Sequence, residues 1–398
     1  MQNSERKIAN ILFQLLVLLW VLCYLPLFSL VMGPTFTGDL SKIICIGGIF
    51  LYLNNYKKMC FAQSNTYIGV MIVAFILHSL FTSNVNILQP FWESLKWILI
   101  VVIMVVSKDH KDCRILVYVL FIFYLSQVGM SIYERCTLSN IVDYASFIKG
   151  DNQLGFRIAE QYNETSEFRS CALLGHGLNN ANVTSIIMAF ILCSRMNNYT
   201  KYVLLALGGL ALWGFNSRAA IGCWFLIFLL RFLFKSNNVL YLFFAFGIIF
   251  LILPLFVDYI STGILGRFNF DFSDDSSAAR VFAFELFFMH DWTLEQILFG
   301  GLIIYIPGTE LSLENGVLLN LCYWGWIIGI LKTILEVGIT YVVLPAYLNR
   351  DEKFLILLAT WGVAFGNNNS FQPLVISFYM FTLIAFNSLN YLMQVRKI

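Results

Sequence analysis

The chain has 398 residues and a net charge of +2; 59% of its residues are hydrophobic, and only 12% are charged. A soluble domain carries about twice that share of charged residues, so this composition excludes an ordinary soluble protein. The chain also lacks a basic tract of the kind that binds nucleic acid. Its four histidines and nine cysteines show no spacing typical of a metal site, and we expect no metal and no other cofactor.

Apolar segments of about twenty residues recur along the chain and indicate an all-α polytopic membrane protein. The first segment is too long for a signal-peptide core, so we interpret it as an uncleaved helix. We expect a single integral membrane domain over 1–398 with about twelve crossings. These are 8–32, 38–54, 66–83, 88–107, 113–133, 173–194, 201–216, 218–234, 238–257, 313–347, 354–368 and 371–393.

The lysines and arginines between these segments predict the topology through the positive-inside rule. With the amino terminus inside, every inner connection is basic, whereas the short outer turns 33–37 and 84–87 carry no lysine or arginine. Both termini are therefore expected in the cytoplasm. The inner basic residues are Lys57, Lys58, Lys108, Lys111, Arg114, Arg195, Lys201, Arg231, Lys235, Arg350, Lys353, Arg396 and Lys397.

Two predicted outer loops, 134–172 and 258–312, are much longer than the other connections. Long loops escape the charge rule, so the arginines in them do not contradict the topology. Cys136 and Cys171 flank the first loop, and the sequence leaves open whether they pair or stay as free thiols. In the second loop, the pattern predicts a helix from Ala278 to His290 whose related faces carry Phe282, Glu285, Leu286 and Met289.

The predicted crossing 313–347 is unusually long. As one helix it would reach roughly 50 Å, against about 30 Å of hydrocarbon, so we expect it to begin as a short interfacial or re-entrant helix. Lys332 and Glu336 lie within it at i and i+4, and we expect the two charges to neutralise each other.

Four polar elements fall on the predicted outer side and are candidates for a shared site. They are Arg169 with the segment from Gly175 to Asn182, Ser217-Arg218, the segment from Asp274 to Arg280, and Glu314-Asn315-Gly316. Arg218 is the most informative, because a guanidinium group keeps its proton and its planar fork binds phosphate bidentately. Three arginines and an asparagine-rich helix start predict a cradle for a pyrophosphate. The alternatives are a helix-end anchor for Arg218 and a helix-start carboxylate for Glu314.

Over roughly Arg169 to Gly329, these elements resemble the O-antigen polymerase and ligase family of bacterial membrane glycosyltransferases. The similarity lies in His176 to Asn182, in Ser217-Arg218-Ala219, in the stretch from Arg280 to Gly301, and in Glu314-Asn315-Gly316 with the later glycines Gly325 and Gly329. Ligases of this family typically have a histidine where this chain has Glu314, and that difference favours a polymerase.

The resemblance implies a GT-C-like fold in the bacterial inner membrane, with the two long loops in the periplasm. It implies transfer of a growing glycan from undecaprenyl pyrophosphate onto the next lipid-linked repeat unit, among membrane lipids and with a chain-length regulator protein as a partner. The implied catalytic residues are Arg218, Arg280 and Glu314, and the implied substrate-binding residues are Arg169, His176, Asn180, Asn182 and Asn315. The alternatives are a ligase that transfers polysaccharide to lipid A–core, and a multi-pass secondary transporter or lipid-linked glycan flippase.

Overall fold

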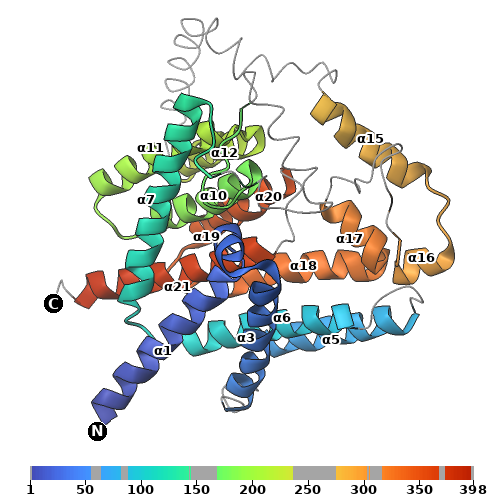
Figure 1. Cartoon of the computed structure of the whole chain (residues 1–398), viewed down its shortest axis with the longest axis horizontal. Coiled ribbons are helices and arrows are strands. Elements are labelled where there is room, and N and C mark those ends of the chain that lie inside the picture. Colours follow the sequence, from blue (N-terminus) through green and yellow to red (C-terminus); the bar gives the residue numbers. More distant parts are fainter. Residues whose placement is uncertain are drawn as a thin grey trace, which may run out of the picture.

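Figure 1 shows the computed structural model of the chain. The structure describes residues 2–54, 64–81, 88–142, 144, 168–235, 275–302, 304, 316–366 and 373–395. Every regular element within these ranges is a helix, so the predicted all-α class is confirmed for the described part of the chain. The predicted crossing 238–257 lies outside the described residues, as do large parts of both long loops.

The helices follow one another along the chain with short breaks. In the first half they are α1 (Gln2–Leu22), α2 (Pro26–Met32), α3 (Pro34–Asn54), α5 (Ser64–Phe81), α6 (Leu88–Ser107), α7 (Arg114–Thr137) and α10 (Gly177–Cys193). In the second half they are α11 (Asn198–Phe215), α12 (Arg218–Lys235), α15 (Asp275–Met289), α16 (Leu294–Phe299), α17 (Gly316–Trp324), α18 (Trp326–Val342), α19 (Arg350–Leu357), the π-helix η3 (Leu358–Gly362), α20 (Val363–Gly366) and α21 (Pro373–Val395).

Three helices in the described part of the chain are long and apolar enough to cross a membrane: α3, α7 and the Leu374–Val395 part of α21. The pair α1 and α2 gives a fourth crossing if it is counted as one span. The prediction of one continuous helix over 8–32 is wrong, because the two helices meet at an 88° bend. Pro26 stands in the first turn of α2, where its ring fits, whereas inside a longer helix it would break the hydrogen-bond ladder.

The twelve crossings predicted from the sequence are not shown. Some of the predicted segments form helices that are short or interrupted: α10 has 17 residues, and the helix over 350–366 contains the single π-helical turn η3. An apolar segment of the sequence includes turn residues beside the helix as well as the residues of the helix itself. Such segments therefore overestimate how far each helix extends.

The α10 helix lies at the centre of the fold, among α7, α11, α12, α20 and α21 (Figure 1). Nearly all of its side chains are buried, from Gly177 to Cys193. A helix that is apolar all round is stable only when other helices surround it, and the α10 sequence has this character. Phe190 packs against Tyr379 and Phe386 of α21, with ring centroids 5.7 and 5.8 Å apart. The central helix therefore links the two halves of the chain.

The long crossing predicted over 313–347 is not one helix. Gly325 separates α17 from α18 with a φ of 82° and a ψ of 163°, a conformation that is essentially restricted to glycine. The two helices pack against each other, and Asn320 Nδ2 of α17 donates to Thr333 Oγ1 of α18 at 3.4 Å. The expected short helix at the start of this segment is thus confirmed as α17.

The predicted neutralisation of Lys332 by Glu336 is confirmed. Lys332 Nζ lies 2.6 Å from Glu336 Oε1, and both side chains are buried. Their spacing places them one turn apart on the same face of α18. The pair carries no net charge into the interior of the helical bundle.

The predicted inner connections share one end of the structure. The Cys113 N–H donates to Ser388 Oγ at 2.7 Å, and the Arg195 N–H donates to Asn390 Oδ1 at 3.1 Å. The first turn of α1 and the last turn of α21 also lie on one side of Figure 1. The described basic connections therefore gather at what we call the basic end. The turn before α10 lies at the opposite end of that helix.

Candidate functional site

The turn before α10, residues 168–176, is called the connecting turn below. The Ser170 N–H donates to the Gly214 carbonyl of α11 at 3.1 Å. The Phe168 carbonyl accepts a hydrogen bond from Arg135 Nη1 at 2.7 Å. Arg135 stands in the last turn of α7, where a cation also offsets the negative end of the helix dipole. The connecting turn is thereby fixed against α7 and α11.

Glu134 of α7 is the main anchor of the connecting turn. Its carboxylate is fully buried and accepts three hydrogen bonds. Oε1 accepts from the Ile141 N–H at 2.9 Å, while Oε2 accepts from Ser170 Oγ at 2.5 Å and from the Ala172 N–H at 3.0 Å. A buried carboxylate is stabilised only when its oxygens are satisfied in this way. The α7 helix continues to Thr137, past residue 133 where the predicted crossing ends.

Asn180 holds the same turn from the α10 side. Its Oδ1 accepts from Gln127 Nε2 at 2.7 Å and from the Leu174 N–H at 3.1 Å. Its Nδ2 donates to the Cys171 carbonyl at 2.6 Å. These bonds give Asn180 a positioning role in the structure, and its predicted contact with substrate stays a prediction.

The sequence analysis missed the polar face of α7. Gln127, Ser131 and Glu134 stand at i, i+4 and i+7 within an otherwise apolar helix, and all three are fully buried. Ser131 Oγ donates to the Ala211 carbonyl of α11 at 3.0 Å. This spacing places them on one face, so helical periodicity applied to the polar residues could have identified them.

Asn182 lies deeper in the core and faces another group of helices. Cys193 follows three turns later on the same face, and its Sγ lies 3.8 Å from the Glu352 carbonyl of α19. Asn182 is fully buried, and among the described residues neither atom of its side-chain amide has a hydrogen-bond partner. Each unpaired group costs about 1–3 kcal/mol. The predicted role of Asn182 in substrate binding stays a prediction.

Arg169 and His176 lie beside each other at the start of α10. A Cβ atom added at Gly177 would lie 3.3 Å from Arg169 Cβ and 3.1 Å from the Phe215 carbonyl oxygen, so the two segments approach closely around this glycine. Burial and the charge of Arg169 lower the pKa of His176 to about 4. The imidazole is therefore neutral at pH 7 and adds no charge beside Arg169.

Arg218 is the first residue of α12. Asn216 ends α11 in the left-handed conformation, with a φ of 52°. The buried Ser217 then caps α12, because its Oγ accepts from the Ala220 N–H at 3.3 Å. A guanidinium group at the positive end of a helix dipole is unfavourable unless an anion lies nearby.

The first two predicted elements therefore converge. The amino-terminal ends of α10 and α12 lie at the same end of the molecule, together with Arg169 and Arg218. Backbone N–H groups at helix starts are unpaired within their helices and attract anions. A helix start with an arginine beside it is an arrangement that can bind a phosphate-like group.

The other two predicted elements are only partly described. Glu314, Asn315 and the side chain of Arg280 lie outside the described residues. The predicted helix over 278–290 is confirmed as α15, and its buried face carries Ala283 and Phe287. This face packs against Leu318 and Cys322 of α17, and Figure 1 shows α15 apart from α10 and α12.

The glycine stretch at the end of α16 is docked onto the break between α17 and α18. The Gly301 N–H donates to the Tyr323 carbonyl at 2.8 Å, and the Leu302 N–H donates to the Cys322 carbonyl at 3.2 Å. The Phe299 carbonyl lies 2.7 Å from His78 Nδ1 of α5. This part of the predicted 258–312 loop is thus ordered by contacts with three helices.

In the described part of the chain, no group of three histidine, cysteine, aspartate or glutamate side chains lies close enough together to hold a metal ion. Cys136 and Cys171 form no disulfide with each other, and the first is exposed and the second buried. The structure thus favours the second of the two alternatives that the sequence left open.

In its described part the chain is all-α, with three or four helices long and apolar enough to cross a membrane and with a polar turn that carries Arg169 at the start of its central helix. Comparison with protein-family models, with curated proteins and with solved structures finds no match for this chain. A functional assignment must therefore be argued from its own residues.

Proposed function

We propose that this chain is a membrane glycosyltransferase that polymerises lipid-linked glycan repeat units at the end where α10 and α12 begin. The observation that supports the proposal best is the close approach of the start of α10, beside Arg169, to the end of α11, three residues before Arg218. The lysines and arginines of the opposite end suit the inner side of a membrane. On this proposal the arginine site faces the periplasm.

The proposed reaction replaces one bond to the anomeric carbon of the donor sugar by another. An acceptor hydroxyl oxygen attacks this carbon, and the bond to the pyrophosphate of the undecaprenyl carrier breaks. Negative charge then builds on the departing pyrophosphate. Arg169 and Arg218 would stabilise it by charge-assisted hydrogen bonds. The implied catalytic role of Arg280 stays a prediction, because its helix α15 lies apart from α10 and α12.

The acceptor hydroxyl must lose its proton as it attacks. Glu314 is the proposed base, because a carboxylate in a partly apolar site can have a pKa raised enough to accept that proton. The neutral His176 would act differently. Since its pKa is lowered to about 4, it can donate a hydrogen bond to the sugar or the phosphate without adding to the positive charge. Asn182 and Asn315 complete the proposed set of substrate contacts.

The chain offers less support for transport. A carrier of charged lipid-linked glycan needs polar or charged groups in a central passage. The buried charges at Lys332 and Glu336 form a closed pair with 2.6 Å between Nζ and Oε1. The proposal of a glycosyltransferase is therefore preferred to that of a transporter or flippase.

The experiment is complementation of a host from which the gene has been deleted. The Arg218→Ala variant removes the proposed pyrophosphate contact. The Arg114→Ala variant is the matched control, because Arg114 lies at the basic end and pairs with Asp112 at 2.9 Å on the surface. Each variant is compared with wild type at equal membrane levels, and the surface polysaccharide is separated on a gel.

If the proposal is right, the deletion host carries only a single repeat unit on its lipid A–core. Arg114→Ala restores the ladder of long polysaccharide bands on the gel, and Arg218→Ala does not. Bare core with long glycan on the carrier lipid would identify a ligase. An unchanged ladder in the deletion host would reject both glycosyltransferase assignments.

A further inference from the structure

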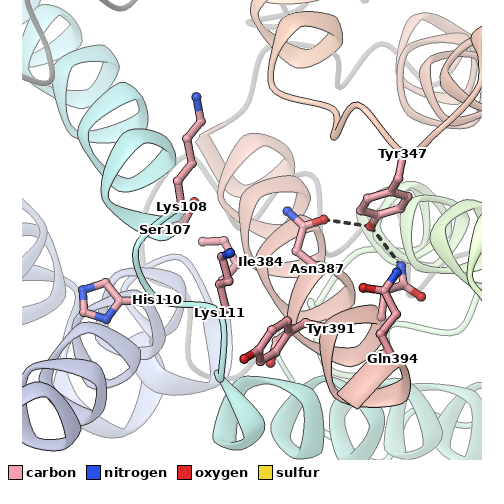
Figure 2. A pocket seen from close by; sticks show the side chains of 11 residues that line it. Ser107, Lys108, His110, Lys111, Tyr347, Ile384, Asn387, Tyr391 and Gln394 are labelled. Carbon is pink, nitrogen blue, oxygen red and sulfur yellow. Dashed lines mark hydrogen bonds between the residues drawn. The ribbon is translucent and has the colours of Figure 1, made fainter. Parts of the chain in front are cut away.

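A second polar site lies at the basic end, away from the connecting turn. It is a pocket of about 240 Å³ between the connection from α6 to α7, the connection from α18 to α19 and the last turns of α21 (Figure 2). Its polar lining includes Lys108, Lys111, Tyr347, Asn387, Tyr391 and Gln394. The volume is roughly eight times the ~30 Å³ that one water occupies in the liquid, and it lies below the ~300 Å³ at which pockets for drug-sized molecules begin.

Two lysines of the connection from α6 to α7 supply positive charge to the lining of the pocket. In the described part of the chain, neither Lys108 nor Lys111 forms an ion pair or a side-chain hydrogen bond. Other basic residues at this end do have partners: Arg114 pairs with Asp112 at 2.9 Å, and Lys201 Nζ donates to the Ser194 carbonyl at 2.7 Å. The pocket therefore combines a cavity with two cations that have no partner of their own.

The opposite wall of the pocket is polar and fixed in place. Tyr347 Oη donates to Asn387 Oδ1 and accepts from Asn390 Nδ2, both at 2.9 Å. These bonds leave the Asn387 amide nitrogen turned toward the side of the pocket where the lysines lie, as Figure 2 shows. Tyr391 and Gln394 add further polar groups from the same helix. A ligand would thus meet cations on one side and hydrogen-bond donors on the other.

We propose that this pocket binds a phosphate group, carried by the headgroup of an anionic membrane lipid. An ammonium group is a strong partner for phosphate, and basic pockets between helices at the cytoplasmic side of a membrane suit such headgroups. The volume suits a small polar headgroup. This site is separate from the proposed glycan site and does not depend on that function. Free inorganic phosphate offers the same chemistry, and the test below distinguishes it from the lipid headgroup.

The test measures lipid binding to the purified full-length chain in a neutral detergent. Phosphatidylglycerol and phosphatidylcholine with the same acyl chains are titrated separately, and inorganic phosphate is added as a competitor in a third arm. The test variant is Lys108→Gln/Lys111→Gln. The control is Lys353→Gln, which lies at the same end with its ammonium group over the Tyr341 ring at 5.5 Å and outside the pocket.

The wild type and the control are expected to bind phosphatidylglycerol more tightly than phosphatidylcholine. The double variant should bind phosphatidylglycerol about 25-fold more weakly, since each lysine near a membrane surface contributes about fivefold. Raising the salt concentration should weaken the wild type's preference. Displacement of the lipid by millimolar inorganic phosphate would identify free phosphate as the source of the group. Equal binding of the two lipids, or unchanged binding by the double variant, would overturn the proposal.

Discussion

The buried carboxylate of Glu134 allows a quantitative test of how the candidate site is held in place. In Glu134→Ala the Ile141 N–H, the Ala172 N–H and the Ser170 hydroxyl all lose their acceptor. Each unsatisfied buried donor costs about 1–3 kcal/mol, so the variant should lose at least about 3 kcal/mol of stability. In Glu134→Gln one side-chain oxygen remains as an acceptor. The loss should then be about 1–3 kcal/mol, from the one backbone donor that faces the amide nitrogen.

The assay is thermal unfolding of the purified protein in detergent, followed by tryptophan fluorescence. The matched control is Glu295→Gln, an exposed carboxylate on α16, which should unfold like the wild type. The expected order of melting temperatures is wild type and Glu295→Gln, then Glu134→Gln, then Glu134→Ala. If Glu134→Ala melts with the wild type, Glu134 does not anchor the connecting turn and this reasoning is wrong.

Three further predictions concern other parts of the fold. Gly325→Ala should destabilise the protein, because alanine disfavours the backbone conformation of Gly325 and its Cβ would lie 2.7 Å from the Leu298 carbonyl oxygen. The control Gly209→Ala lies in an open part of α11 and should be neutral or stabilising. Chemical denaturation measures both variants, and equal effects would contradict the need for glycine at position 325. Lys332→Met should lower the free energy of unfolding by about 3–5 kcal/mol, because it leaves Glu336 buried without its cation. The double variant Lys332→Met/Glu336→Gln should recover part of that loss. If the same denaturation assay finds the double variant less stable than the single one, the pairing is refuted. The folded protein holds the pKa of His176 at about 4, below the ordinary 6.5, so the unfolded chain binds more protons than the folded one between these pH values. The stability of the wild type relative to His176→Gln should therefore fall as the pH drops from about 6.5 toward 4. Melting temperatures of the two proteins that change equally with pH would show that the pKa of His176 is not lowered.

The sequence predictions that the structure confirms relied on local patterns. The spacing of Lys332 and Glu336 placed both side chains on one helical face, and they form the expected pair. The alternation of basic and neutral connections placed Cys113, Arg195 and their neighbours at one end of the molecule, and their contacts with α21 agree. These features depend on neighbours along the chain or on summed charge, which a sequence shows directly.

The failures concern lengths of helices and contacts between distant segments. Apolar composition continues through the bend at Pro26, so hydropathy alone joined two helices that the backbone separates. Glu134 was placed in a loop because its partners, such as Ser170, lie 36 residues further along the chain. A buried carboxylate and a solvated one look alike in a sequence until the groups that bind them are known.

The central claim is that the arginine site catalyses glycan transfer from a pyrophosphate carrier. The most direct measurement incubates the purified protein with its lipid-linked repeat unit and follows glycan length and carrier release by mass spectrometry. Wild type and Arg114→Ala are expected to release undecaprenyl pyrophosphate as chains of two or more repeat units form, whereas Arg218→Ala should form neither product. Chain growth by Arg218→Ala at the wild-type rate would show that Arg218 takes no part in the transfer.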